Sequence, residues 1–250
     1  MSNYKEWFVK LKDQRNQRPI DDDSGVAYVL VAASPVEIAI VDRFGTALAN
    51  PLAFSNGELR FYTAKSVTSL DISLLTATGY AVYATSIDNS EHSLFIDREQ
   101  RSQLLVVPYA ASDNTLVDTG FDLPANLVIQ EAMLRVVTVD AGETIDFGFA
   151  NAVESGDLDG LIVAALVSAA GLIELRPQIT GGSNIDFGST NFVGALLATT
   201  IAGADAVATV GGSTPKNYRT DGMIKSLVYT GSAGSDVAAG FFYLRYLKLV

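Results

Sequence analysis

The stretch from Thr119 to Gly160 constrains the fold more than any other part of the chain. Apolar and often β-branched residues run from Leu127 to Val139, and Pro124, Gly142 and Gly148 divide the stretch into short pieces. Apolar runs of this length bounded by Gly and Pro are typical of strands joined by tight turns. The stretch holds no set of side chains with catalytic spacing, so it favours a structural role over an enzyme.

Composition extends this expectation to the whole chain. Its 250 residues are 48% hydrophobic and 18% charged, which is enough apolar material for a sizeable core. Residues that favour strands are plentiful, and 21 glycines separate short apolar runs. We therefore expect an all-β protein with an N-terminal basic arm and linker (1–24), a small β-sandwich-like domain (25–97) and a larger jelly-roll-like sandwich (98–250).

Alternation and turn residues locate individual strands. In the small domain we expect strands at 27–32, 36–41, 58–62, 67–75 and 80–87. In the larger domain we expect them at 103–107, 128–139, 144–149, 161–167, 171–175, 192–200, 224–230 and 239–250. Turns are predicted at Asp42–Gly45 and at Asn56-Gly57, where both residues tolerate a positive φ. The last strand is apolar on both faces, which predicts a central place in its sheet.

The N-terminal segment differs from the rest of the chain. Tyr4, Trp7, Phe8 and Leu11 are spaced i, i+3, i+4 and i+7, which predicts a short helix with one apolar stripe. Three interpretations stay open: the helix packs on its own domain, it docks on a neighbouring subunit, or the segment is a frayed tail. Asp21–Gly25 then forms a solvated linker. The second interpretation assigns partner binding to Tyr4, Trp7, Phe8, Leu11, Lys12 and Arg15.

Charge is unevenly distributed. The net charge is −11, yet residues 1–18 hold five basic and two acidic side chains, which leaves a net charge of −14 for the remainder. An acidic body repels nucleic acid, so no nucleic-acid partner is expected. The segment before Lys10 lacks the apolar core of a secretory signal, and the longest apolar run, Leu161–Ile173, is shorter than the about 20 residues of a membrane span. We expect a soluble protein without a membrane partner.

Several kinds of catalytic site are excluded by residue usage. The chain has no cysteine, which removes thiol catalysis and cysteine-ligated zinc, and its one histidine, His92, lies in a polar segment that predicts a solvated loop. Glu154, Asp157 and Asp159 precede Gly160, but the full spacing of a calcium loop is missing, so a solvated turn is the favoured interpretation. We expect no metal and no cofactor.

Acidic residues that could act as a glycosidase pair give no specific signal. Asp71, Asp122, Asp146 and Asp186 are candidates only as any carboxylates would be. Asp146 and Asp186 share the context Ile-Asp-Phe-Gly, which favours a structural role such as capping a turn. The glycine segments at 181–184 and 211–214 lack the Lys-[Ser/Thr] of a phosphate-binding loop and predict sheet connections. No catalytic residue is assigned.

Two groups of motifs resemble known structural proteins of tailed-bacteriophage virions. The segments Gly45–Pro51, Asn56-Gly57, Phe61-Tyr62 and Gly79–Tyr83 are similar to a small β module of phage fibre and other virion proteins. Asp118–Ala125, Ser226–Thr230 and Gly240–Tyr246 resemble a virion-protein architecture that covers about residues 115 to 250.

The resemblance implies a non-enzymatic virion protein, assembled in the host cytoplasm. Its leading form is a capsid decoration or cement protein that binds the major capsid protein as a homo-oligomer, with a trimer expected from the three-fold sites of capsids. The alternative is a tail fibre or receptor-binding protein that recognises host glycans, with Tyr109, Tyr218 and Tyr229 as stacking residues. A glycan-degrading enzyme is a third possibility.

Overall fold

The protein is all-β in the residues that the structure describes. The structure, a computed structural model, describes residues 4–150, 158–173, 224–234 and 237–249, with the backbone of short strand segments between 179 and 219. None of these residues is helical, so the described part of the chain contains no apolar helix that would reach across a membrane. The chain divides into two compact units, Met1–Pro108 and Tyr109–Val250.

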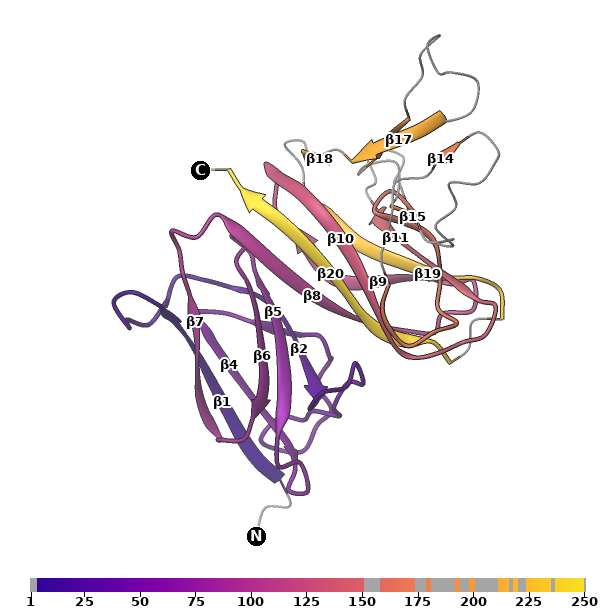
Figure 1. Ribbon diagram of the computed structural model, residues 1–250. Helices are drawn as coiled ribbons and strands as arrows, with labels where there is room; N and C mark the ends of the chain where they lie inside the picture. The colour runs from indigo at the N-terminus through magenta and orange to yellow at the C-terminus, as the bar shows by residue number, and fades with distance from the viewer. Residues whose placement is uncertain are drawn as a thin grey trace. The chain divides into compact units, whose positions relative to one another are not determined.

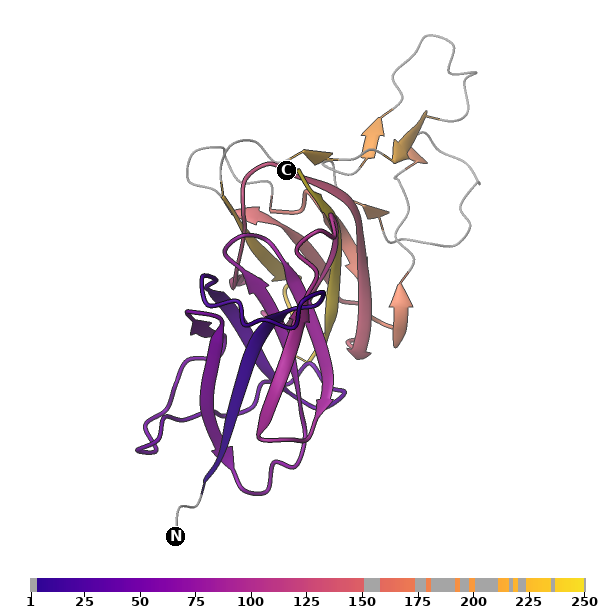
Figure 2. The same cartoon turned by 90° about the vertical axis from the view of Figure 1, so that its left-hand side faces the viewer.

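Unit 1 is a two-layered sandwich (Figures 1 and 2). Its strands are β1 (Tyr4–Asp13), β2 (Gly25–Val31), β3 (Leu52–Phe54), β4 (Glu58–Ala64), β5 (Leu70–Thr76), β6 (Ala81–Ile87) and β7 (Glu91–Ile96). One sheet has the order β4-β1-β7 and the other β3-β2-β5-β6. β1 pairs antiparallel with β4 and parallel with β7.

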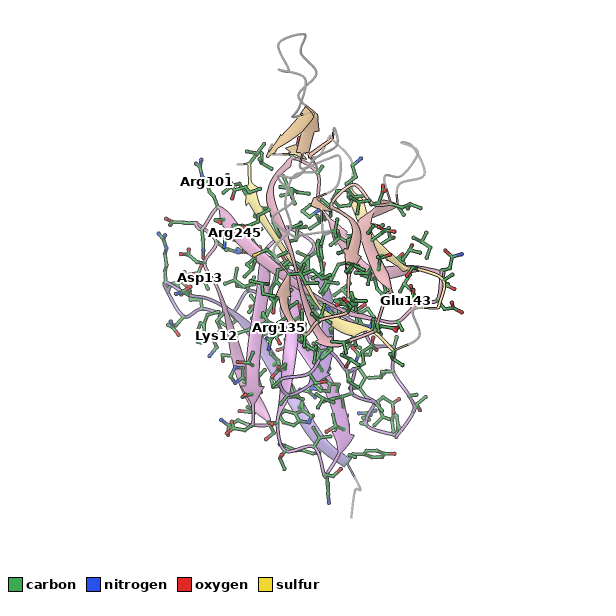
Figure 3. The ribbon with its side chains drawn as sticks, turned by 45° about the vertical axis from the view of Figure 1, so that its right-hand side comes forward. Lys12, Asp13, Arg101, Arg135, Glu143 and Arg245 are labelled. Carbon is green, nitrogen blue, oxygen red and sulfur yellow. The ribbon has the colours of Figure 1, made fainter. Side chains whose placement is uncertain are left out.

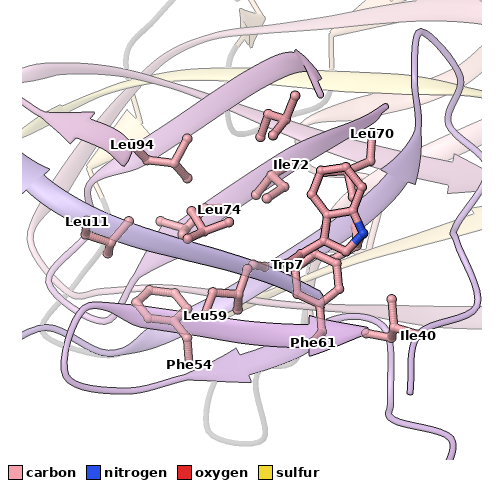
Figure 4. Close-up of a cluster of buried hydrophobic side chains, with 14 of the residues drawn as sticks. Trp7, Leu11, Ile40, Phe54, Leu59, Phe61, Leu70, Ile72, Leu74 and Leu94 are labelled. Carbon is pink, nitrogen blue, oxygen red and sulfur yellow. The ribbon is translucent and has the colours of Figure 1, made fainter. Parts of the chain in front are cut away.

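The two sheets of unit 1 enclose one apolar core (Figure 4). Trp7 is fully buried between the layers, where its ring stacks on Phe61 at a centroid distance of 6.4 Å. Its indole Nε1–H donates to Thr63 Oγ1 at 2.9 Å, which satisfies the one polar group that the side chain takes into the core. Leu11 and Val9 of β1 lie in the same core, facing strands β2 and β5 of the second sheet.

The predicted N-terminal helix is wrong, because Tyr4–Asp13 is the strand β1. Burial alternates along it: Trp7, Val9 and Leu11 are buried, while the residues between them are partly exposed. This is the period of two that a strand with one buried face requires. The helical spacing left out Val9, and the neighbours that complete β1 lie some 50 to 85 positions along the chain. Residues 4–13 are therefore a central strand of unit 1 and not a separate arm.

The expected solvated linker is also wrong at Asp23, which is buried. Its Oδ1 accepts from the Ser24 N–H at 3.0 Å, and its backbone carbonyl accepts from the Gly57 N–H at 2.8 Å. Desolvation raises the pKa of Asp23 despite these hydrogen bonds. The Asn56-Gly57 turn is confirmed, with φ values of 54° and 63°.

Unit 2 is a second sandwich-like body. Its longer strands are β9 (Leu116–Leu123), β10 (Leu127–Thr138), β11 (Thr144–Ala150), β12 (Ile162–Leu166), β19 (Lys225–Gly231) and β20 (Ala239–Lys248), and β8 (Ser102–Ala110) contains the boundary between the units. Short strands are β13 (Gly171–Ile173), β14 (Ile179–Thr180), β15 (Phe192–Val193), β16 (Ala198–Thr200), β17 (Gly211–Pro215) and β18 (Tyr218–Arg219). The sheet orders are β13-β10-β20-β8, with β18 also on β10, then β15-β12-β11-β19-β9, and β14-β17-β16.

Aromatic rings pack between the two larger sheets of unit 2. Phe147 of β11 stacks on Phe242 of β20 at 4.3 Å, and Tyr109 of β8 meets Phe147 edge-on at 5.7 Å. Tyr229 of β19 completes the cluster at 5.4 Å from Phe147. β20 lies between β10 and β8, so the predicted central place of the last strand is confirmed.

Most predicted strands are confirmed to within a few residues. Four details differ: 36–41 carries only isolated bridges, His92 lies in β7 and not in a loop, the segment 211–214 belongs to strand β17 and not to a connection between strands, and β3, β7, β9, β14 and β18 are additional strands. Predictions for Glu154, Asp157, the 181–184 loop and Asp186 lie outside the described residues.

Candidate functional site

The six predicted partner-binding residues are divided between the two faces of unit 1's first sheet and the turn that follows β1. Trp7 and Leu11 point into the core and are unavailable to a partner. Tyr4, Phe8 and Lys12 point the other way, onto the solvent side of the sheet, and Figure 3 shows Lys12 at the outer margin of unit 1. Arg15 lies in the turn after β1.

Arg15 is committed to ion pairs within the unit. Its Nε lies 3.3 Å from Asp97 Oδ1, and its Nη1 contacts a carboxylate oxygen of Glu99. Both pairs are substantially exposed, so each contributes little to stability. They nevertheless orient the turn after β1 against the end of β7.

We call the solvent-facing side of β1 and β4 the β1 face; its members are Tyr4, Glu6, Phe8, Lys10, Lys12, Glu58, Arg60 and Tyr62. Phe8 occupies its centre, with two cations over its ring. Lys10 Nζ lies 4.8 Å and the Arg60 guanidinium carbon 4.7 Å from the ring centroid. Cations at these distances are attracted by the ring's negative face, which holds the aromatic and the basic side chains together.

Carboxylates complete the β1 face. Lys10 Nζ lies 3.7 Å from Glu58, and Arg60 Nε lies 3.7 Å from Glu6 Oε1. The Tyr62 hydroxyl donates to the same Glu6 oxygen at 3.0 Å. Desolvation, followed by this hydrogen bond and the Glu6 charge, raises the pKa of Tyr62. The face therefore presents aromatic and charged side chains in fixed positions.

A loop at the edge of this face carries the most exposed large apolar side chain among the described residues. Phe44 is 77% exposed at the tip of Asp42–Thr46. The preceding residue, Val41, exchanges two backbone hydrogen bonds of 2.9 Å with Tyr62 of β4, so the loop is joined directly to the sheet. Sequence reasoning predicted this turn but gave Phe44 no role. The place of Phe44 in the turn was a partial signal, but the exposure of its ring depends on how the turn projects from the edge of the sheet.

The three described carboxylates considered for glycoside hydrolysis accept hydrogen bonds within the fold. Asp71 is fully buried and accepts from the Ala33 N–H at 2.8 Å, the Ser86 N–H at 2.7 Å and the Tyr83 hydroxyl at 3.2 Å. Both backbone donors belong to residues with positive φ. Asp71 thus ties two irregular backbone segments to β5.

The other two carboxylates bind neighbouring strands. Asp122 Oδ1 accepts from the Ser226 hydroxyl at 2.5 Å. Asp146 Oδ1 accepts from the N–H of Ala164, a residue with a φ of 48° beside the irregular pairing of β11 with β12. Desolvation raises the pKa of Asp146. The carboxylate of Asp146 therefore caps an irregular backbone segment, which agrees with the structural role expected from its sequence context.

The tyrosines proposed for sugar stacking are core residues where their side chains are described. Tyr109 and Tyr229 are buried in the aromatic cluster of unit 2, so neither offers a ring to a ligand. The side chain of Tyr218 lies outside the described residues. The assignment of Tyr109 and Tyr229 to glycan binding is therefore wrong, because both side chains lie on strand faces that are buried in the core of unit 2.

The described acidic residues do not form a cation site. Asp159 and Gly160 lie in a turn before β12, and within the described part of the chain no group of three His, Cys, Asp or Glu side chains is arranged to hold a metal ion.

Comparison of the chain with protein-family models, with curated proteins and with solved structures found no match.

Proposed function

We propose that this chain is a non-enzymatic structural protein of a virion, a decoration protein that binds the outer capsid shell through the β1 face. The observation that carries the proposal is the arrangement around Phe8, an aromatic side chain between two cations on strands that the core makes rigid. Aromatic and arginine side chains in fixed positions are the residues that dominate binding energy at protein interfaces.

The use of the carboxylates supports a binding role over catalysis. A general acid or base must exchange a proton with its substrate, and a glycosidase needs two carboxyl groups on either side of one bond. Asp71, Asp122 and Asp146 instead hold strands and irregular backbone segments of the fold in place.

The chemistry of the β1 face also favours a protein partner. Its basic and acidic side chains alternate, in pairs such as Lys10–Glu58 and Arg60–Glu6. Such alternation suits a partner surface with the complementary pattern of charges. It determines the orientation in which the two surfaces bind more than it adds affinity. The acidic remainder of the chain keeps copies dispersed before they bind.

A decoration protein stabilises a shell by burying area across the joints between its subunits. The interaction of each copy opposes the separation of those joints, and the contributions of many copies on one particle add up. Docking at three-fold positions would place three copies together, consistent with the expected trimer.

The test is co-sedimentation of the purified chain with empty shells of the virus that encodes it. The double variant Phe8→Ser with Arg60→Glu removes the centre of the β1 face, and Leu172→Ser in unit 2 is the control, because Leu172 is 61% exposed and lies on β13, outside that face. We expect the wild type and L172S to saturate the shells at a fixed stoichiometry and the double variant to lose at least tenfold in affinity. Failure of the wild-type chain to bind shells would refute the proposal.

A further inference from the structure

Phe44 stands on a loop whose shape is fixed by one carboxylate. Asp42 Oδ1 accepts from the Phe44 N–H at 2.8 Å and from the Thr46 N–H at 2.9 Å. These hydrogen bonds lower the pKa of Asp42, with the bond from Thr46 as the largest cause. The Asp42 N–H also donates to the Thr46 carbonyl at 2.8 Å, and Gly45 closes the turn with a φ of 88°. A loop held in this way loses little further freedom on binding.

The loop also packs against side chains and backbone of the β1 face. A side chain at position 45 would meet the ring of Tyr4 at 3.2 Å, so Gly45 lies against that ring. On the far side, Val41 pairs with Tyr62. Phe44 is therefore presented by a braced turn that continues the β1 face.

The charges next to Phe44 are basic. The Arg43 guanidinium carbon lies 4.5 Å from the Phe44 ring centroid. Arg43 belongs to the loop that Val41 joins to Tyr62, and Arg60 shares the solvent-facing side of β4 with Tyr62. The carboxylate of Asp42 is turned toward the backbone donors of its own loop. An apolar ring beside the guanidinium group of Arg43 complements an apolar pocket edged by carboxylates.

We propose that Phe44 is the anchor of the shell interface: it enters an apolar pocket on the capsid surface whose rim carries carboxylates that pair with Arg43. This inference rests on the proposed function and names the chemistry of its partner surface. A buried aromatic side chain surrounded by polar contacts that exclude water is the usual form of an interface anchor.

A shell protein suits this loop better than a membrane does, and a second copy of the chain is the alternative that the experiment must separate. A loop of one copy that enters a pocket on an identical copy makes a head-to-tail contact, which would be detected as self-association of the free chain. An anionic membrane surface attracts clusters of basic side chains that have no acidic side chains among them. On the neighbouring β1 face, Glu6 and Glu58 lie among the basic side chains, so this surface does not suit a membrane.

The experiment uses the full chain and the same empty shells. Phe44→Ser removes the anchor, Phe44→Trp restores an aromatic ring, Arg43→Glu reverses the adjacent charge, and L172S is the control. We expect F44S to weaken shell binding at least tenfold, F44W to recover most of it, and R43E to weaken it severalfold while reducing its dependence on salt. Unchanged fluorescence of Trp7, buried in the core of unit 1, verifies that F44S and R43E are folded. Far-ultraviolet circular dichroism does the same for F44W, which carries a second tryptophan.

The outcomes separate the two proposals. Wild-type binding that F44S leaves unchanged would overturn the anchor and leave the shell-binding function standing. Absence of wild-type binding would refute both. Two further results would refute the proposal that Phe44 enters a pocket on the shell. One is self-association of the free wild-type chain in sedimentation velocity that F44S loses, and the other is binding of the wild type to anionic lipid vesicles that F44S loses.

Discussion

The sharpest test of the fold of unit 2 is the removal of one oxygen atom from Tyr109. Its side chain is 2% exposed, and its hydroxyl is the one buried side-chain polar atom without a hydrogen-bond partner among the described residues. Burial raises the pKa of Tyr109, so its hydroxyl stays neutral inside the aromatic cluster. Tyr109→Phe should therefore stabilise the protein.

The expected size follows from two opposing effects. A buried polar group that lacks a partner costs about 1–3 kcal/mol, since its hydration is lost without compensation. Removing the oxygen gives up a few dispersion contacts of about 0.1–0.2 kcal/mol each. We expect a net gain of about 1 kcal/mol, which raises the midpoint of urea unfolding by roughly 0.3–1 M for typical denaturant slopes.

Tyr229→Phe is the matched control, because Tyr229 belongs to the same cluster and loses the same atom. Its hydroxyl accepts from the Ala110 N–H at 3.3 Å, so the variant forfeits a hydrogen bond and should lose about 1 kcal/mol. Near-ultraviolet circular dichroism of the cluster follows unit 2, while fluorescence of Trp7 follows the core of unit 1. If Tyr109→Phe destabilises the protein as much as Tyr229→Phe does, the hydroxyl has a partner and the reasoning is wrong.

Four further substitutions test unit 1. Trp7→Ala should cost about 3–5 kcal/mol by cavity formation, and calorimetry should show this loss if Trp7 is a core residue and not a partner anchor. Gly57→Ala should cost about 3 kcal/mol or more in urea unfolding, because its Cβ would lie 1.8 Å from the Ile20 carbonyl oxygen at a positive φ. Asp71→Asn should lose about 1–3 kcal/mol by the same measurement, since an amide NH₂ would face a donor. Asp23→Asn tests the raised pKa of that carboxyl. As pH falls from 7 to about 4, the folded wild type binds a proton before the unfolded chain does, so the stability of the wild type should rise relative to that of the variant. Equal dependence of the two stabilities on pH would contradict this.

The sequence was a good guide to local structure. Apolar runs and turn residues placed most strands, and Asn56-Gly57 marked a turn with two positive φ values, because these features depend on a few consecutive residues. The N-terminal segment shows the limit. Both a period of 3.6 and a period of two can be drawn through Tyr4–Asp13, and only pairing with β4 and β7 selects the strand.

The candidate surface was predicted in part. Tyr4, Phe8 and Lys12 do lie on one exposed face, whereas Trp7 and Leu11 were placed on it by a helical spacing that the chain does not adopt. Phe44 was passed over, since its exposure depends on how the turn projects from the edge of the sheet.

By itself the sequence determined that this chain forms strands and turns around an apolar core, without cysteine chemistry and with an acidic surface overall. Only the tertiary structure decided which aromatic side chains are core and which are presented to a partner. The physical reason is that burial is set by residues distant in the chain: Trp7 donates its hydrogen bond to Thr63, 56 positions away, while Phe44 has no strand packed over it. Such long-range contacts leave no periodic trace in the local sequence.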